Sequence, residues 1–169
     1  MGNTGLRRGR RLVYGARMTR ARIRLPREVY QSPHAVSVTI CARGRRLVFS
    51  HSALARDCIA LLYDMAQATD VPVYAYCLMP DHAHLLLSTS GKNDVVDFVG
   101  QWKGLTTRLS WQRGLQGSWW QRRFYDHVLR DDESLQDCAR YILNNPVRAG
   151  LAETWREYPF SGSLIFDDL

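Results

Sequence analysis

Three short segments of the chain have the apolar and polar pattern of β-strands. Residues 34–42 are rich in β-branched side chains, which favour the extended backbone. Residues 71–78 are predicted to be a second strand, and residues 82–88, which belong to an apolar run after a Pro-Asp break, a third. Because only a short break containing Pro80 and Asp81 separates the last two, we expect them to pair as a hairpin.

Two segments between and after these strands carry apolar residues three and four positions apart, which predicts helices. Ser52 caps the first helix, and Asn93 or Asp94 caps the second. The apolar stripe of the first helix consists of Leu54, Cys58, Leu61, Leu62 and Met65, and that of the second of Val95, Phe98, Val99, Trp102, Leu105 and Leu109.

The C-terminal third of the chain predicts one more strand and one more helix. A loop over residues 111–120 leads into an edge strand over residues 123–129. A helix over residues 131–144 follows, with acidic residues at its positive end, and Pro146 stops it. The tail, residues 147–169, is aromatic enough to pack back on the body.

The order of these elements is strand, helix, strand, strand, helix, strand, helix. The first six match an α+β, ferredoxin-like (RRM-like) sandwich, an antiparallel sheet with two helices on one face. The seventh element, the C-terminal helix, can then lie against the open face of the sheet. We expect one domain over residues 26–169, preceded by a flexible basic arm over residues 1–25.

Charge narrows the range of partners. The chain has 169 residues and a net charge of +7 with a pI near 9.6, which suggests a polyanionic partner, nucleic acid before membrane. Nine arginines lie within residues 1–30, so a basic tail on a neutral domain is the alternative. That arm either adds phosphate affinity or is a solvated leader.

Neither a membrane protein nor an exported one is expected. No apolar run approaches the roughly 20 residues of a spanning helix, and the N-terminus lacks the apolar stretch of a signal peptide. The four cysteines are far apart in apolar segments, which predicts reduced core residues of a cytoplasmic protein: Cys41, Cys58, Cys77 and Cys138.

The third strand carries the first candidate chemistry. His82 and His84 flank Ala83, and residues two apart in a strand point to the same face. Two neutral imidazoles side by side form half of a metal site. Taken alone, however, such a pair is also common among exposed or core histidines.

The C-terminal helix carries the second half. Tyr141 lies on the flank of its buried stripe, and Asn145 follows one turn later. A phenol ionises only near pH 10, so it needs help to act as a nucleophile. With His82, His84 and the Asn145 side-chain oxygen around Mg²⁺ or Mn²⁺, it could attack a phosphodiester and leave a 5′-phosphotyrosine. Asn145 could instead cap the helix, with water as the third ligand.

Four segments, in order, resemble a known family. Residues 76–86 (YCLMPDHAHLL) are similar to the HUH motif of single-tyrosine, IS200-like transposases. Residues 141–151 (YILNNPVRAGL) resemble the tyrosine helix of their REP-associated branch, and residues 38–41 and 120–130 also fit that branch. The likeness covers about residues 22 to 160.

The resemblance implies a bacterial enzyme that cleaves and rejoins single-stranded DNA with a divalent metal. It implies His82 and His84 as metal ligands, Tyr141 as nucleophile and Asn145 as the polar residue that helps to hold the metal. The substrates would be hairpins of repetitive extragenic palindromes, and the protein would be a monomer or a homodimer.

Further residues are weaker candidates for DNA contacts. His127 approaches the site, contacts DNA or is an exposed edge residue, and Trp119 and Trp120 either stack on bases or pack in the core. Five basic residues either contact phosphates or are solvated: Lys103, Arg122, Arg123, Arg130 and Arg148.

Two functions of other classes remain open at this stage. A ferredoxin-like sheet can bind single-stranded nucleic acid without catalysis, as RRM domains do, although the aromatic pattern of that class is missing. A zinc hydrolase would need a third ligand, for which His34, His51 and His127 are available.

Overall fold

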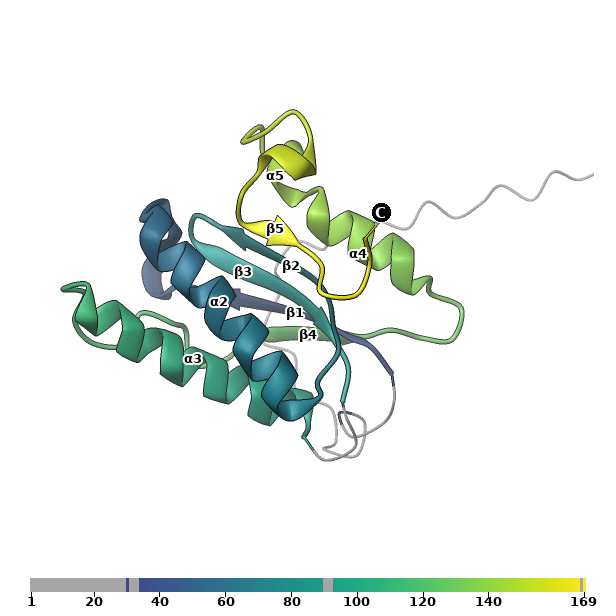
Figure 1. The fold of residues 1–169 in the computed structure, drawn as a ribbon, viewed down its shortest axis with the longest axis horizontal. Helices are drawn as coiled ribbons and strands as arrows, with labels where there is room; N and C mark the ends of the chain where they lie inside the picture. The colour runs from purple at the N-terminus through teal and green to yellow at the C-terminus, as the bar shows by residue number, and fades with distance from the viewer. Residues whose placement is uncertain (1–29, 31–33, 90–92, 168) are drawn as a thin grey trace, which may run out of the picture.

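The computed structural model describes residues 30, 34–89, 93–167 and 169, so the predicted arm over residues 1–25 lies outside the described residues. Five strands form one antiparallel sheet in the order β4-β1-β3-β2-β5, shown in Figure 1. Their bounds are Val36–Cys41 (β1), Val73–Met79 (β2), His82–Leu87 (β3), Tyr125–Val128 (β4) and Ser161–Gly162 (β5). The first four strands have the ferredoxin-like order, so the predicted fold is confirmed.

The helices cover both faces of this sheet. Two long helices, α2 (Ser52–Thr69) and α3 (Val95–Gln112), pack on one face, while α4 (Leu135–Leu143) and α5 (Asn145–Arg148) lie on the other (Figure 1). Three short 3₁₀ turns complete the described elements: η1 (Arg43–Arg45), η2 (Val48–Ser50) and η3 (Trp155–Glu157).

The alternation of side chains along β3 divides its residues between two cores. Ala83, Leu85 and Leu87 belong to the large core under α2 and α3. Leu86 belongs to a smaller core that α4 covers with Cys138, Ala139, Ile142 and Leu143. Since residues two apart share a face, His82 and His84 lie on the α4 side with Leu86.

Several predicted boundaries were wrong, each for a local reason. Helix α3 continues to Gln112, because its first left-handed residue is Gly114 at φ +80°. Helix α4 begins at Leu135 and not at residue 131, since the Ser134 hydroxyl accepts from the Asp137 amide at 3.2 Å and caps the first turn. Strand β4 covers only four of the seven predicted residues.

Pro146 does not simply stop a helix. Helix α4 ends at Leu143, and Pro146 lies in the first turn of α5, where its missing N–H is not required. Asn145 is therefore the first residue of a second helix, whereas the sequence predicted a single helix with Asn145 following one turn after Tyr141.

Trp119 and Trp120 are core residues. They are 1% and 2% exposed, their rings stack with centroids 4.0 Å apart, and the Trp120 indole donates to the Thr106 hydroxyl at 2.9 Å. Rings buried in this way cannot stack on a DNA base, so that prediction was wrong and the packing alternative is correct. The four cysteines are buried and unpaired, as predicted.

Within the described part of the chain, no helix has the length and apolar character that crossing a bilayer requires.

Candidate metal and tyrosine site

The two β3 histidines turn their imidazoles toward each other. The Nε2 atoms of His82 and His84 lie 3.0 Å apart, and the ring planes meet at 82°. Strands on either side hold the pair in place, because His84 lies between Thr39 of β1 and Cys77 of β2 in the sheet register. The regular alternation of β3 therefore brings the two nitrogens together.

This spacing fits a shared cation. Two nitrogen ligands each about 2.1 Å from one ion and at right angles to each other are about 3.0 Å apart. That is the observed separation of the two Nε2 atoms. As the rings stand, one Nε2 donates a proton to the other, whereas both must offer lone pairs to bind the same ion. The pair can thus supply two ligands of an octahedral metal centre.

A carboxylate fixes the orientation of the first histidine. The Oδ1 atom of Asp81 lies 2.5 Å from Nδ1 of His82, and the Asp81 Oδ2 atom accepts from the Arg45 guanidinium at 3.1 Å. Burial alone would raise the pKa of Asp81, but the hydrogen bond and charge of His82, together with Arg45, hold it below its usual value. Asp81 thus remains ionised and accepts a hydrogen bond from Nδ1–H of His82, which leaves the lone pair on Nε2 of His82 free to bind a cation.

The loop that carries Arg45 is attached to the β2–β3 turn by its backbone. The amide of Ala42 donates to the Asp81 carbonyl at 2.9 Å, and that of Phe49 donates to the Pro80 carbonyl at 3.0 Å. Gly44 and Arg45 both have left-handed backbones, with φ of +63° and +55°. The left-handed backbone costs free energy at a residue other than glycine, and at Arg45 this backbone accompanies the contact of its guanidinium with Asp81.

The second histidine is held by a hydroxyl. Nδ1 of His84 lies 3.0 Å from Oγ1 of Thr39 on β1. Burial, then the neighbouring charges of His82, Arg148 and Arg45, lower the pKa of His84 to about 3. His84 is therefore neutral near pH 7, the form that binds a metal. The Thr39 hydroxyl can either donate or accept, so it suits either tautomer of the ring.

The tyrosine helix covers the same face of the sheet as the histidines. Helix α4 packs on β2 and β3, and Tyr141 lies on the half-buried flank of its apolar stripe. The guanidinium carbon of Arg148 is 4.3 Å from the centre of the Tyr141 ring. The charge of the same guanidinium is among those that lower the pKa of His84. The structure thus brings both halves of the predicted site to one face.

Asn145 stands at the junction of α4 and α5. Its side-chain nitrogen donates to the carbonyls of Tyr141 and Ile142, at 3.3 and 3.0 Å. Because only the amide NH₂ can donate to a carbonyl, the oxygen of Asn145 points away from the end of α4. Helix capping and metal binding are therefore compatible roles for this side chain.

The remaining candidates are spread over the molecule. His127 faces the α4 side of the sheet, but its Nε2 is 2.9 Å from the Glu133 carboxylate. Lys103 donates to the carbonyls of Gln121 and Arg122, so its ammonium supports the loop before β4. Arg122, Arg123, Arg130 and Arg148 are exposed.

Three neighbours of the histidine pair were not predicted. Asp81 directly precedes His82, and Thr39 alternates with the core residues of β1, so both carried a local signal that could have been used. Arg45 carried none, because its contact with Asp81 spans 36 residues and depends on a left-handed backbone.

A zinc centre is not supported. Among the described residues, no three of the histidines, cysteines, aspartates and glutamates are placed to hold one ion. Among the described residues, a third protein ligand beside His82 and His84 would therefore be of another type, such as the amide oxygen of Asn145.

The chain matches the family described as "Transposase IS200 like" over residues 30–145. This match covers more than half of the chain and includes both histidines and the tyrosine. The chain belongs to this family.

Two curated proteins that are similar to this chain are named as REP-associated tyrosine transposases. A protein of Haemophilus influenzae, provisionally designated a REP-associated tyrosine transposase, is 33% identical over 98 residues, which is 52% of this chain and 56% of the relative. The REP-associated tyrosine transposase of Escherichia coli is 28% identical over 89 residues, 53% of this chain and 52% of the relative. The chain thus spans about half the length of these relatives.

A solved structure shares the fold. It is described as a REP-associated tyrosine transposase bound to a REP hairpin, with a TM-score of 0.63 and 23% identity. The likeness covers 85% of this chain and 82% of the other. At this identity the match shows that the two proteins have the same fold.

Proposed function

We propose that this chain cleaves and rejoins single-stranded DNA, with Tyr141 as nucleophile and a divalent cation, Mg²⁺ or Mn²⁺, held by His82, His84 and Asn145. The observation that carries the proposal is the 3.0 Å approach of the two Nε2 atoms on the face that the tyrosine helix covers. Membership of a transposase family agrees with it.

The reaction follows from the groups present. The Tyr141 oxygen passes its proton to water and attacks phosphorus; the bond from phosphorus to the 3′ oxygen of the leaving strand breaks, and that oxygen takes up a proton from water. The products are a 5′-phosphotyrosine on this chain and a free 3′-hydroxyl, which can attack in reverse to restore the strand. The cation would polarise the phosphate and orient it for in-line attack. Arg148, stacked on the tyrosine ring, would restrict the phenol to one direction.

Hairpin DNA is the proposed substrate. The solved structure with this fold is described as bound to a REP hairpin, and the chain is basic enough to bind such a polyanion. We propose that the reaction takes place in the bacterial cytoplasm, where this DNA lies.

A non-catalytic RRM-like module is less well supported. Such a module stacks bases on aromatics of the open sheet face, but here α4 covers that face and the two adjacent tryptophans are in the core.

The test is formation of a covalent adduct. Wild-type protein is incubated with labelled hairpin DNA and Mn²⁺, and the products are separated in SDS. We expect a DNA–protein band in wild type and in Tyr63→Phe, which changes a tyrosine on α2, and none in Tyr141→Phe. An adduct of normal yield in Tyr141→Phe would refute the assignment of the nucleophile.

A further inference from the structure

Two loop segments far apart in the sequence bring four exposed arginines to one end of the sheet. Arg43 and Arg46 follow β1, and Arg122 and Arg123 precede β4. The segments are joined by their backbones: the Arg43 amide donates to the Trp119 carbonyl at 2.6 Å, and the Gln121 amide donates to the Cys41 carbonyl at 2.9 Å. We name Arg43, Arg46, Arg122 and Arg123 the arginine end.

In the described ranges, no acidic side chain neutralises the arginine end. Within the described part of the chain, none of the four guanidinium groups has an ion-pair partner, whereas Arg45 beside them is paired with Asp81. Four unpaired cations on two adjoining loops attract a polyanion, and guanidinium groups match phosphate oxygens in particular.

The arginine end adjoins the histidine pair. The amide of Ala42, next to Arg43, donates to the carbonyl of Asp81, and Asp81 precedes His82. Cys41 lies directly opposite His82 in the sheet register. A strand of DNA with its scissile phosphate at the histidines therefore has the arginine end beside it.

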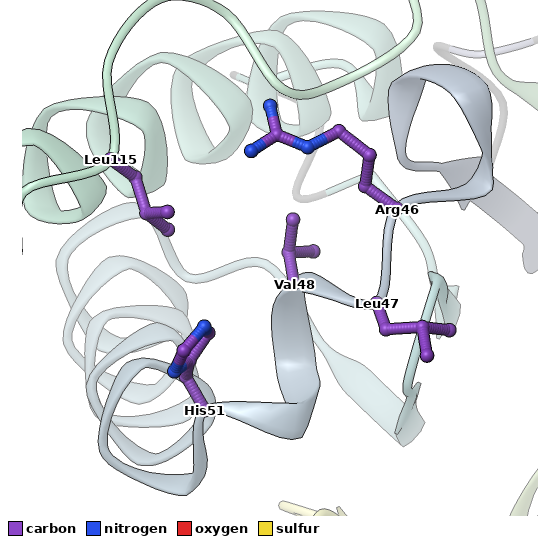
Figure 2. A pocket seen from close by; sticks show the side chains of 5 residues that line it. All are labelled: Arg46, Leu47, Val48, His51 and Leu115. Atoms are coloured by element: carbon purple, nitrogen blue, oxygen red, sulfur yellow. The ribbon is translucent and has the colours of Figure 1, made fainter.

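A pocket of about 310 Å³ opens beside Arg46 and gives this surface a place for a base. Figure 2 shows Val48 at its centre, with His51 and Leu115 entering from different elements and the Arg46 guanidinium reaching over the opening. A second hollow of about 250 Å³ shares His51 and Leu115. Apolar walls with an imidazole and a cation at the rim are the surroundings that an unstacked base and its phosphate require.

We propose that single-stranded DNA beside the cleavage site crosses the arginine end, with its phosphates on these four arginines and one base in the pocket between Val48, His51 and Leu115. This rests on the proposed function, because it takes the same DNA as partner. It adds the path that the strand follows away from the tyrosine.

The phosphate contacts are tested by salt dependence. Binding of a fluorescein-labelled hairpin with a single-stranded tail is followed by anisotropy from 50 to 200 mM salt, with EDTA present so that no strand is cut. Each single-strand phosphate contact contributes about 0.7 to the slope of log K against log salt. We expect the magnitude of this slope to be smaller by about 3 in the fourfold variant, in which Gln replaces Arg43, Arg46, Arg122 and Arg123. Arg108→Gln, an exposed arginine of α3, should keep it.

The pocket is tested with a fluorescent base. 2-Aminopurine is placed at each tail position in turn, and we expect one position whose emission changes on binding to wild type and to His34→Ala, but not to His51→Ala. A wild-type salt slope in the fourfold variant, no responsive base position, or tighter binding of the same sequence as RNA would overturn the proposal.

The two proposals fail separately. If wild type forms no covalent adduct, the proposed function fails, whereas the salt slopes in EDTA still report on the arginine end. If wild type forms the adduct and the fourfold variant keeps the wild-type slope, only the path of the strand is wrong.

Discussion

Replacing Asp81 by Asn should weaken metal binding without disturbing the fold. The substitution keeps the shape of the side chain but removes the charge that faces Nδ1 of His82 across 2.5 Å. An amide can also present its NH₂ group to the ring, which would turn the other imidazole nitrogen into a donor. His82 would then spend part of the time in a tautomer that cannot bind a cation.

The expected loss follows from this contact. A hydrogen bond to a charged group contributes about 1.5–3 kcal/mol. The Asp81 and His82 side chains are 22% and 19% exposed, so solvent screens the interaction only in part. Loss of a partner that orients a metal-binding histidine typically costs 10- to 100-fold in metal affinity, or about 1.4–2.7 kcal/mol. We expect Asp81→Asn to lie within this range.

Mn²⁺ binding to the protein alone measures the effect. Mn²⁺ is added in steps, and electron paramagnetic resonance measures the free ion, because bound Mn²⁺ loses its sharp signal. The measurement needs neither DNA nor catalysis. Asp57→Asn is the matched control, because Asp57 also pairs with an arginine, Arg113, but on α2. Equal Mn²⁺ affinity in Asp81→Asn and wild type, with both proteins folded at the temperature of the assay, would refute the role assigned to this carboxylate.

Three further predictions concern the neighbours of the site. Thr39→Val removes the hydroxyl beside Nδ1 of His84 and should weaken Mn²⁺ binding about tenfold by the same measurement, while Thr39→Ser should not. Arg148→Gln removes the cation stacked on Tyr141 and should slow adduct formation at saturating DNA about tenfold; a change confined to DNA affinity would make it a phosphate contact instead. Because the pKa of Asp81 is lowered, its interactions with His82 and Arg45 stabilise the fold above about pH 4. We expect the difference in unfolding free energy between wild type and Asp81→Asn, measured by urea titration, to shrink in stronger acid.

The sheet was predictable because its strands have a clear period. The apolar run after Pro80 identified the strand over residues 82–88, the two-residue spacing of its histidines placed both on one face, and the structure has both features. The end of α3 was less clear, because Trp111 can belong to a helix or to a loop and only Gly114 decides between them.

The two tryptophans after that loop could not be assigned from sequence. Trp119 and Trp120 are as suitable for stacking on bases as for packing. Their burial is decided by partners in distant segments, Phe49 and Trp102, whose contacts no local pattern reveals. The same limit applies to Arg45, since an ion pair across 36 residues leaves no trace in the spacing of the sequence.

The split of β3 between two cores restricts how this segment can vary. Its even-numbered residues carry the imidazoles, and its odd-numbered residues fill the interior under α2 and α3. Deleting or inserting a single residue after Pro80 would turn Leu85 outward and a histidine inward. We therefore expect this strand to tolerate changes of side chain more readily than a change of length by one residue, because the latter exchanges the contents of its two faces.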